Sequence, residues 1–155
     1  MALFTFGEGY HNFHHKFQWD YRNGIRWYDF DPSKWIIKIL SFFSLTYDLK
    51  KVQESRILKA RFDCLNEQAL NLLSGKTSTS YKKYLIMLED INAKAKIYMK
   101  SWREIEKEAS KINILDTIPD QVNRINSLKV QYKGKMQGAI NSLSMLLVAI
   151  KDAVA

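Results

Sequence analysis

Apolar side chains recur at alternating steps of four and three residues through most of the second half of the chain. The clearest run extends over about four heptads. Because a sustained 3.5-residue period keeps one stripe of a helix facing a partner helix, the pattern predicts long helices that pack in a coiled-coil-like manner. The run consists of Tyr84, Leu88, Ile91, Ala95, Tyr98, Trp102, Ile105, Ala109 and Ile112.

Two further apolar runs flank this one and complete a predicted bundle. The polar residues 74–80 precede the central run, with Gly75 placed to end one helix and Ser80 to cap the next. The last run contains Gly134 and Gly138, which weaken a helix by about 1 kcal/mol each, so we expect a bend or fraying there. Together the runs predict an antiparallel three-helix bundle. The flanking runs are Leu58, Phe62, Leu65, Ala69 and Leu72, and Val122, Ile125, Tyr132, Met136, Ile140, Leu143, Leu147, Ile150 and Val154.

A different pattern, a thin polar stripe on an otherwise apolar helix, precedes this bundle. Asp31 can cap a helix and Pro32 suits its first position, so we predict a helix from Pro32 to about Thr46. Such a helix is either buried on most sides or lies in a membrane interface, and the residues alone favour neither. Its apolar stretch is shorter than the roughly 20 residues that span a bilayer. The stripe consists of Lys34, Lys38, Ser41 and Ser44.

The change of pattern divides the chain into residues 1–47 and a basic helical extension, residues 48–155. The net charge is +8, with five Lys or Arg against four Asp or Glu in the first part and nineteen against twelve in the second. A basic surface favours anionic partners. Nucleic acid is not expected, because the aromatic residues are segregated from the lysines. The single cysteine, Cys64, excludes an intrachain disulfide and a cysteine-based metal site.

All three histidines, His11, His14 and His15, lie within five positions near the amino terminus. On a predicted helix over Gly9 to Lys16 they fall within an arc of roughly 100°, with neighbouring Cβ atoms about 5–6 Å apart. Imidazole suits iron, zinc, copper or nickel. Zinc stays open, although the histidine cluster lacks a glutamate placed as a base, and so does a chance cluster of exposed histidines. Nearby aromatic residues can build a dry shell around a metal: Tyr10, Phe13, Phe17, Trp19, Tyr21, Trp27, Tyr28 and Phe30.

The amino-acid sequence around these histidines resembles that of a known family. The stretch GEGYHNFHHKFQWDYRNGIRWYDFDPSKW resembles the third histidine box and following segment of the membrane-bound fatty acyl desaturases of the acyl-CoA delta-9 type. The resemblance runs from about Leu3 to Phe62. It implies an integral membrane enzyme that uses two irons and dioxygen to insert a cis double bond into a fatty acyl-CoA chain. By motif position, His11, His14 and His15 would be iron ligands.

The resemblance also implies partners and a location. These are the remainder of the desaturase domain, the acyl-CoA substrate, an electron-donor protein and membrane lipid, with this segment on the cytoplasmic face. It favours an interfacial or protein-covered position for the helix that begins at Pro32. The family's earlier histidine boxes should precede this stretch, so we expect a carboxy-terminal part of a desaturase, inactive alone. The competing hypothesis is a helical interaction module, residues 50–155, that binds a partner helix or membrane surface, with a vestigial box.

Overall fold

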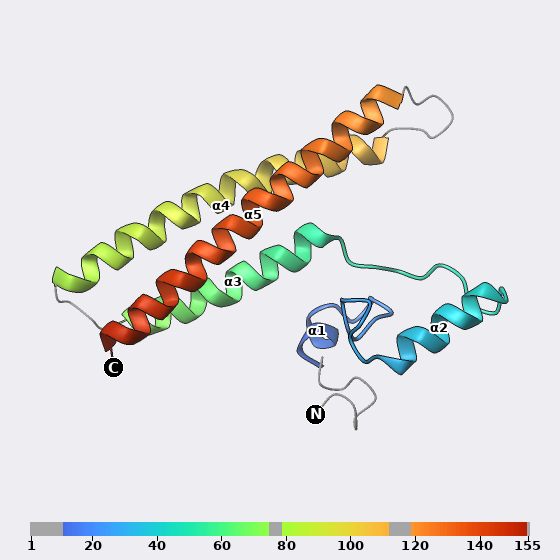
Figure 1. The fold of residues 1–155 in the computed structure, drawn as a ribbon, viewed down its shortest axis with the longest axis horizontal. Coiled ribbons are helices and arrows are strands. Elements are labelled where there is room, and N and C mark those ends of the chain that lie inside the picture. Colours follow the sequence, from blue (N-terminus) through green and yellow to red (C-terminus); the bar gives the residue numbers. More distant parts are fainter. Residues whose placement is uncertain (1–10, 75–78, 112–118, 155) are drawn as a thin grey trace. The chain divides into compact units, whose positions relative to one another are not determined.

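The computed structural model describes residues 11–74, 79–111 and 119–154, and every regular element in these ranges is an α-helix. The predicted all-α class is confirmed. The chain forms two compact units, Met1–Gln53 and Glu54–Ala155. The predicted division between residues 47 and 48 falls inside the first of these units, before its end at Gln53. The helices are α1 (His11–Lys16) and α2 (Pro32–Phe42) in the first unit, and α3 (Glu54–Leu73), α4 (Thr79–Lys111) and α5 (Pro119–Val154) in the second (Figure 1).

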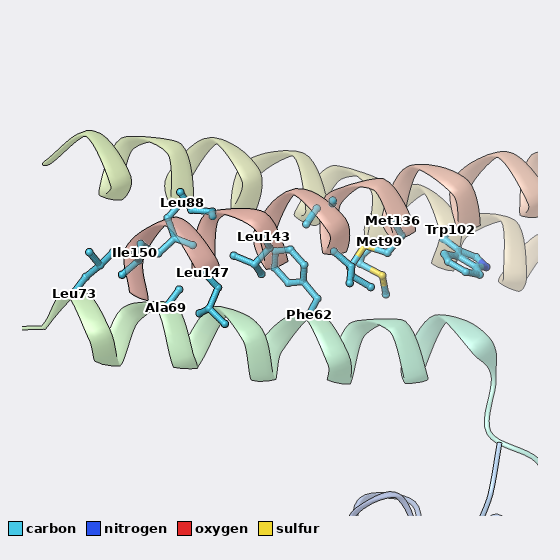
Figure 2. Packing of buried hydrophobic residues seen from close by; sticks show 14 residues of the cluster. Phe62, Ala69, Leu73, Leu88, Met99, Trp102, Met136, Leu143, Leu147 and Ile150 are labelled. Carbon is cyan, nitrogen blue, oxygen red and sulfur yellow. The ribbon is translucent and has the colours of Figure 1, made fainter. Parts of the chain in front are cut away.

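The second unit is a three-helix bundle in which successive helices run in opposite directions, as predicted (Figure 1). Helix α5 packs against both α3 and α4, whereas α3 and α4 touch each other over a smaller area. The core therefore follows the inner face of α5. Its buried side chains come from all three helices (Figure 2): Phe62, Ala69, Leu73, Leu88, Ala95, Met99, Trp102, Met136, Ala139, Ile140, Leu143, Leu146, Leu147 and Ile150.

The heptad pattern predicts most of this core but underestimates the buried stripe of α5. Because α5 lies against two helices, Ala139 and Leu146 are buried in addition to the predicted Ile140, Leu143 and Leu147. The buried face of a helix that packs against two neighbouring helices is wider than the contact line between only two helices. On α4 and α3 the pattern misses Met99 and Leu73 for the same reason, that a buried face of a packed helix includes residues beside the strict seam.

Other details of the predicted bundle have mixed outcomes. Helix α5 begins at Pro119 and continues unbroken through Gly134 and Gly138, so the expected fraying there is wrong. Val122, predicted to face the core, is exposed. The predicted helix stop at Gly75 and the end of the seam at Ile112 lie outside the described residues.

Helix α2 begins as predicted but ends earlier than expected. Asp31 caps it by accepting a hydrogen bond from the Lys34 amide, and Pro32 occupies the first helical position. The end differs because Ser44 adopts a left-handed conformation with φ of 58°. The amides of Leu45 and Ser44 then bond back to the carbonyls of Leu40 and Ser41 at 2.9 and 3.1 Å, which is the Schellman arrangement. The helix therefore ends at Phe42 rather than near Thr46.

Candidate metal centre

The predicted metal ligands lie on α1, the short helix that opens the described chain. The helical bonding continues past its end, since the Phe17 amide donates to the Phe13 carbonyl at 2.9 Å. His14 is half-buried and His15 exposed, and their ring centroids are 6.3 Å apart. The backbone of His11 begins the helix, but its side chain lies outside the described side chains. Convergence of the three imidazoles on one ion therefore stays a prediction.

His14 provides the local observation that bears on a metal. Its Nδ1 is buried and has no hydrogen-bond partner within the described structure. An unpaired buried polar atom costs about 1–3 kcal/mol, so a native site normally gives it one. A ligating histidine either binds the metal through that nitrogen or donates its second N–H to a supporting acceptor. The residues present thus fit an imidazole-bound metal, although no group of three or more His, Cys, Asp or Glu side chains lies together among those described.

The segment after α1 has no regular secondary structure. Hydrogen bonds to two buried carboxylates hold it in place. The first is Asp20, whose two oxygens accept four hydrogen bonds. The Arg22 amide and Nε donate to Oδ1 at 3.0 and 2.9 Å, while the Arg22 Nη2 and the Val52 amide donate to Oδ2, both at 2.8 Å. The Tyr21 amide also donates to the Lys50 carbonyl at 3.2 Å. These contacts fasten the end of the first unit to the segment that follows α1.

The protonation of this pair follows from the same contacts. Burial raises the pKa of the Asp20 carboxyl, but the hydrogen bonds from Arg22 and Val52 and the guanidinium charge outweigh it, so that pKa is lowered below its ordinary value. The hydrogen bond to Asp20 in turn raises the pKa of Arg22. Asp20 is therefore a charged anchor at neutral pH.

The second buried carboxylate is Asp31, which is fully buried and serves as more than a helix cap. Its Oδ2 accepts hydrogen bonds from the amides of Asn23 and Gly24 at 2.7 and 2.9 Å, while Oδ1 accepts the Lys34 amide at 3.0 Å. One side chain thus holds both the start of α2 and the turn eight residues before it. A charged acceptor with three amide donors is among the stronger polar arrangements in proteins.

Lys34, the first residue of the predicted polar stripe, is buried and completes this loop. Of the two positions left open for this helix, the interfacial one would place its lysines at lipid headgroups, but Lys34 is only 6% exposed. Its Nζ donates to the carbonyls of Gly24, Arg26 and Asp29 at 3.1, 2.8 and 3.4 Å. The lysine thereby supplies a donor to three carbonyls of the loop, of which that of Arg26 also accepts the Asp29 amide at 3.2 Å.

The lack of room for a side chain requires glycine at position 24 of this turn. A Cβ added to it would lie 2.5 Å from the Asp29 Cβ. The Asp29 carboxylate accepts the Arg26 amide at 2.8 Å, so it is held against the turn. Only glycine fits there. The sequence marks a turn at Asn23-Gly24 but gives no direct sign of its partners, because those are set by residues five to ten positions away.

The aromatic residues do not close a shell around α1 within the described residues. Phe13 and Phe17 contact each other with centroids 5.2 Å apart, and Phe30 meets the edge of Trp35 at 5.6 Å. Other rings face outward, with Trp27 84% exposed. The exposed rings of this set are Trp19, Trp27 and Tyr28, and Tyr10 lies outside the described residues. The large apolar side chains that are exposed on and around α2 are Trp35, Ile36, Ile39, Phe42, Phe43, Leu45 and Tyr47.

None of the described helices is long and apolar enough to cross a bilayer. Sequence reasoning named Asp31 as a cap, but it missed Asp20 and Lys34 as organising residues. The only local signal for Asp20 was the Asp-x-Arg spacing, which allows the carboxylate to bond an amide two residues on.

Known proteins match part of this chain. Acyl-CoA desaturase 1 of Saccharomyces cerevisiae is 58% identical over 59 residues, 38% of this chain and 12% of that protein. A probable acyl-CoA desaturase of Schizosaccharomyces pombe is 53% identical over 58 residues, 37% of this chain and 12% of that protein. The sn-1 stearoyl-lipid 9-desaturase of Synechocystis is 44% identical over 55 residues, 36% of this chain and 17% of that protein.

No family model and no solved structure matches the chain. The chain spans about 12% of the length of the first two relatives. The aligned stretches of 59 and 58 residues are nevertheless about as long as the stretch of resemblance, Leu3 to Phe62. More than half of their residues are identical to this chain in both yeast proteins. Part of this chain is therefore homologous to the fatty acyl desaturases, the acyl-CoA desaturases and a stearoyl-lipid 9-desaturase among them.

Proposed function

We propose that the first unit is the segment of a fatty acyl desaturase that contains its third histidine box, with His11, His14 and His15 as iron ligands. The observation that supports it best is the identity of 58% to an acyl-CoA desaturase, combined with the buried Nδ1 of His14, which has no hydrogen-bond partner among the described residues. The enzyme would insert a cis double bond into a fatty acyl-CoA chain. Two irons, when bound, supply the oxygen-dependent oxidation that removes hydrogen from an unactivated methylene.

Three imidazoles fill only part of the coordination shells of two irons, so the other ligands would come from residues outside this chain. The chain by itself would then lack desaturase activity. Its own residues would hold and orient the ligands: α1 presents the histidines, and the loop fastened by Asp20, Asp31 and Lys34 fixes the backbone that follows.

The apolar surface of α2 supports the predicted partners. Five of its neighbouring large side chains are exposed, from Trp35 to Phe43, and contiguous apolar surface of this kind marks an interface. We propose that the remainder of the desaturase domain or the cytoplasmic membrane interface covers it. The exposed Lys38 could reach headgroups from such a position, whereas the buried Lys34 could not.

A chimeric enzyme tests this assignment. The 59 aligned residues of the yeast acyl-CoA desaturase would be replaced by those of this chain, and monounsaturated fatty acids would be measured in cells that lack their own desaturase. We expect unsaturated products from the chimera, none from its His14→Ala variant, and normal production from Lys16→Ala, which changes an exposed residue on the same helix. A well-expressed chimera that makes no product, or an active His14→Ala variant, would overturn the proposal.

A second candidate function concerns the bundle. Two grooves lie open on its described surface. One, of about 890 Å³ between α4 and α5, is flanked by the exposed Ile86, Met87 and Met145; the other, of about 610 Å³, lies between α3 and α4. Exposed apolar side chains beside a groove favour a helical interaction module. Size-exclusion chromatography with light scattering, with and without Met87→Gln, tests whether the larger groove mediates self-association: a monomer at all concentrations excludes that role.

A further inference from the structure

The groove between α3 and α4 combines an apolar floor with a basic rim. Its floor is formed by Phe62, Ala95, Met99 and Met136, all of them part of the core. One end is bridged by Asn92, whose Nδ2 donates to the Asn66 Oδ1 at 2.8 Å. Helices α3 and α4 make fewer contacts with each other than either makes with α5, which fits an open groove between them.

The rim on the α4 side is a row of four cations. Lys96, Lys100, Arg103 and Lys107 follow one another at steps of four, three and four residues, so they share one face of the helix over about 16 Å. All four are exposed, and none of their charged side-chain groups forms a hydrogen bond or ion pair within the described chain, although the Lys107 carbonyl accepts the Ser110 hydroxyl at 2.8 Å. Like charges at this spacing destabilise a helix, so the row is unfavourable for α4 by itself.

Carboxylates nearby do not neutralise this row. Lys59 and Asp63 on the opposite rim form an ion pair with each other. Glu104 lines the groove but forms no ion pair within the described chain. Elsewhere on α4, by contrast, Lys94 is paired with Asp90 four residues before it. The four cations are thus a concentrated and unpaired positive surface beside an apolar floor.

We propose that this groove binds an acidic amphipathic helix of a partner protein, which would add a fourth helix to the bundle. Acidic residues at the same four-three-four spacing would face the row on α4, and an apolar stripe beside them would lie on the floor. A flat bilayer could meet the exposed cations but would not reach a floor that lies between two helices. The proposal goes beyond the desaturase assignment and does not depend on it.

A designed peptide provides the probe. It has about three heptads with leucine at a and d and glutamate at e and g, and its controls are a scrambled peptide and one with lysine in place of glutamate. Methyl NMR of the methionines reports where it binds, because Met99 and Met136 line this groove while Met87 and Met145 line the other. We expect shifts of the first pair and none of the second, with binding that weakens as salt is added.

The double variant Lys100→Gln/Arg103→Gln should weaken binding by about fivefold, since each exposed pair contributes modestly. The matched control, Arg124→Gln/Lys151→Gln, removes the same charge from α5 outside the groove and should leave the affinity unchanged. Equal loss in both variants, or shifts confined to Met87 and Met145, would contradict the proposal. So would equal binding of the scrambled peptide, or binding to phosphatidylserine vesicles without binding to the acidic peptide.

Discussion

Asp20, Asp31 and Lys34 organise an irregular segment in which regular backbone hydrogen bonds are scarce. Each is buried, and each pairs with backbone groups at positions far apart in the segment. A buried charge is tolerated only when its hydrogen bonds are satisfied, which explains why these three have several partners each. The contribution of each residue to the stability of the first unit can therefore be tested separately.

Asp31→Asn should destabilise the first unit by about 3 kcal/mol. Asparagine has a single acceptor oxygen, so either the amides of Asn23 and Gly24 or the amide of Lys34 lose their acceptor. Urea unfolding followed by ¹⁹F signals of 5-fluorotryptophan measures it, since three of the four tryptophans lie in this unit. Asp48→Asn, at an exposed position, should change stability by less than about 0.5 kcal/mol. Equal effects of the two would refute the role of Asp31.

The lowered pKa of Asp20 predicts acid sensitivity of the first unit. Since the folded-state pKa lies below the ordinary value of 3.8, the stabilisation is fully present above that value and is lost as pH falls through the folded-state pKa. Urea unfolding between about pH 5 and pH 2 should show this loss, and Asp20→Asn should reduce the slope. An unchanged slope in the variant would contradict the assignment.

At the scale of the elements, the ends of helices were harder to predict than their cores. The heptad pattern locates Leu88, Trp102 and Leu143 correctly because burial follows helical periodicity. The end of α2 could not be read from the sequence because its left-handed residue is Ser44, where glycine is usual. The contacts of Lys34 could not be predicted from the sequence either, since a lysine on a helix normally indicates an exposed face.

Ser44→Gly should stabilise the first unit by about 1 kcal/mol, because glycine adopts a positive φ without the Cβ clash. Ser41→Gly, inside α2, should have the opposite sign by a similar amount, about 1 kcal/mol. The same fluorotryptophan-detected unfolding measures both. If Ser44→Gly lowered stability as Ser41→Gly does, the Schellman ending of α2 would be wrong.

Gly134→Ala and Gly24→Ala should differ in sign. A Cβ at Gly134 meets nothing within 4 Å, so alanine should stabilise α5 by about 1 kcal/mol through its helix propensity. A Cβ at Gly24 lies 2.5 Å from the Asp29 Cβ, so alanine there should destabilise the loop. Thermal unfolding by circular dichroism for the bundle, and fluorotryptophan signals for the first unit, distinguish the two. A stabilising Gly24→Ala would show that the turn is looser than described.

At the scale of the whole molecule, the two units have different sources of stability. The second has a continuous apolar core and needs no partner to bury it, whereas the first depends on buried polar contacts and leaves large apolar residues exposed. The histidine motif was visible in the sequence because its ligand type and spacing are local. The ligands that would complete the proposed di-iron centre could not be predicted, since this chain spans only about 12% of the length of the first two relatives.

Iron binding by the chain itself tests the central claim most directly. Anaerobic titration with Fe(II), followed by calorimetry and elemental analysis, would be applied to the wild-type chain, His14→Ala and the control Lys16→Ala. We predict that wild type and Lys16→Ala bind iron equally and that His14→Ala binds at least about tenfold more weakly. Iron affinity that is absent from the wild type, or is the same in His14→Ala, would contradict the account.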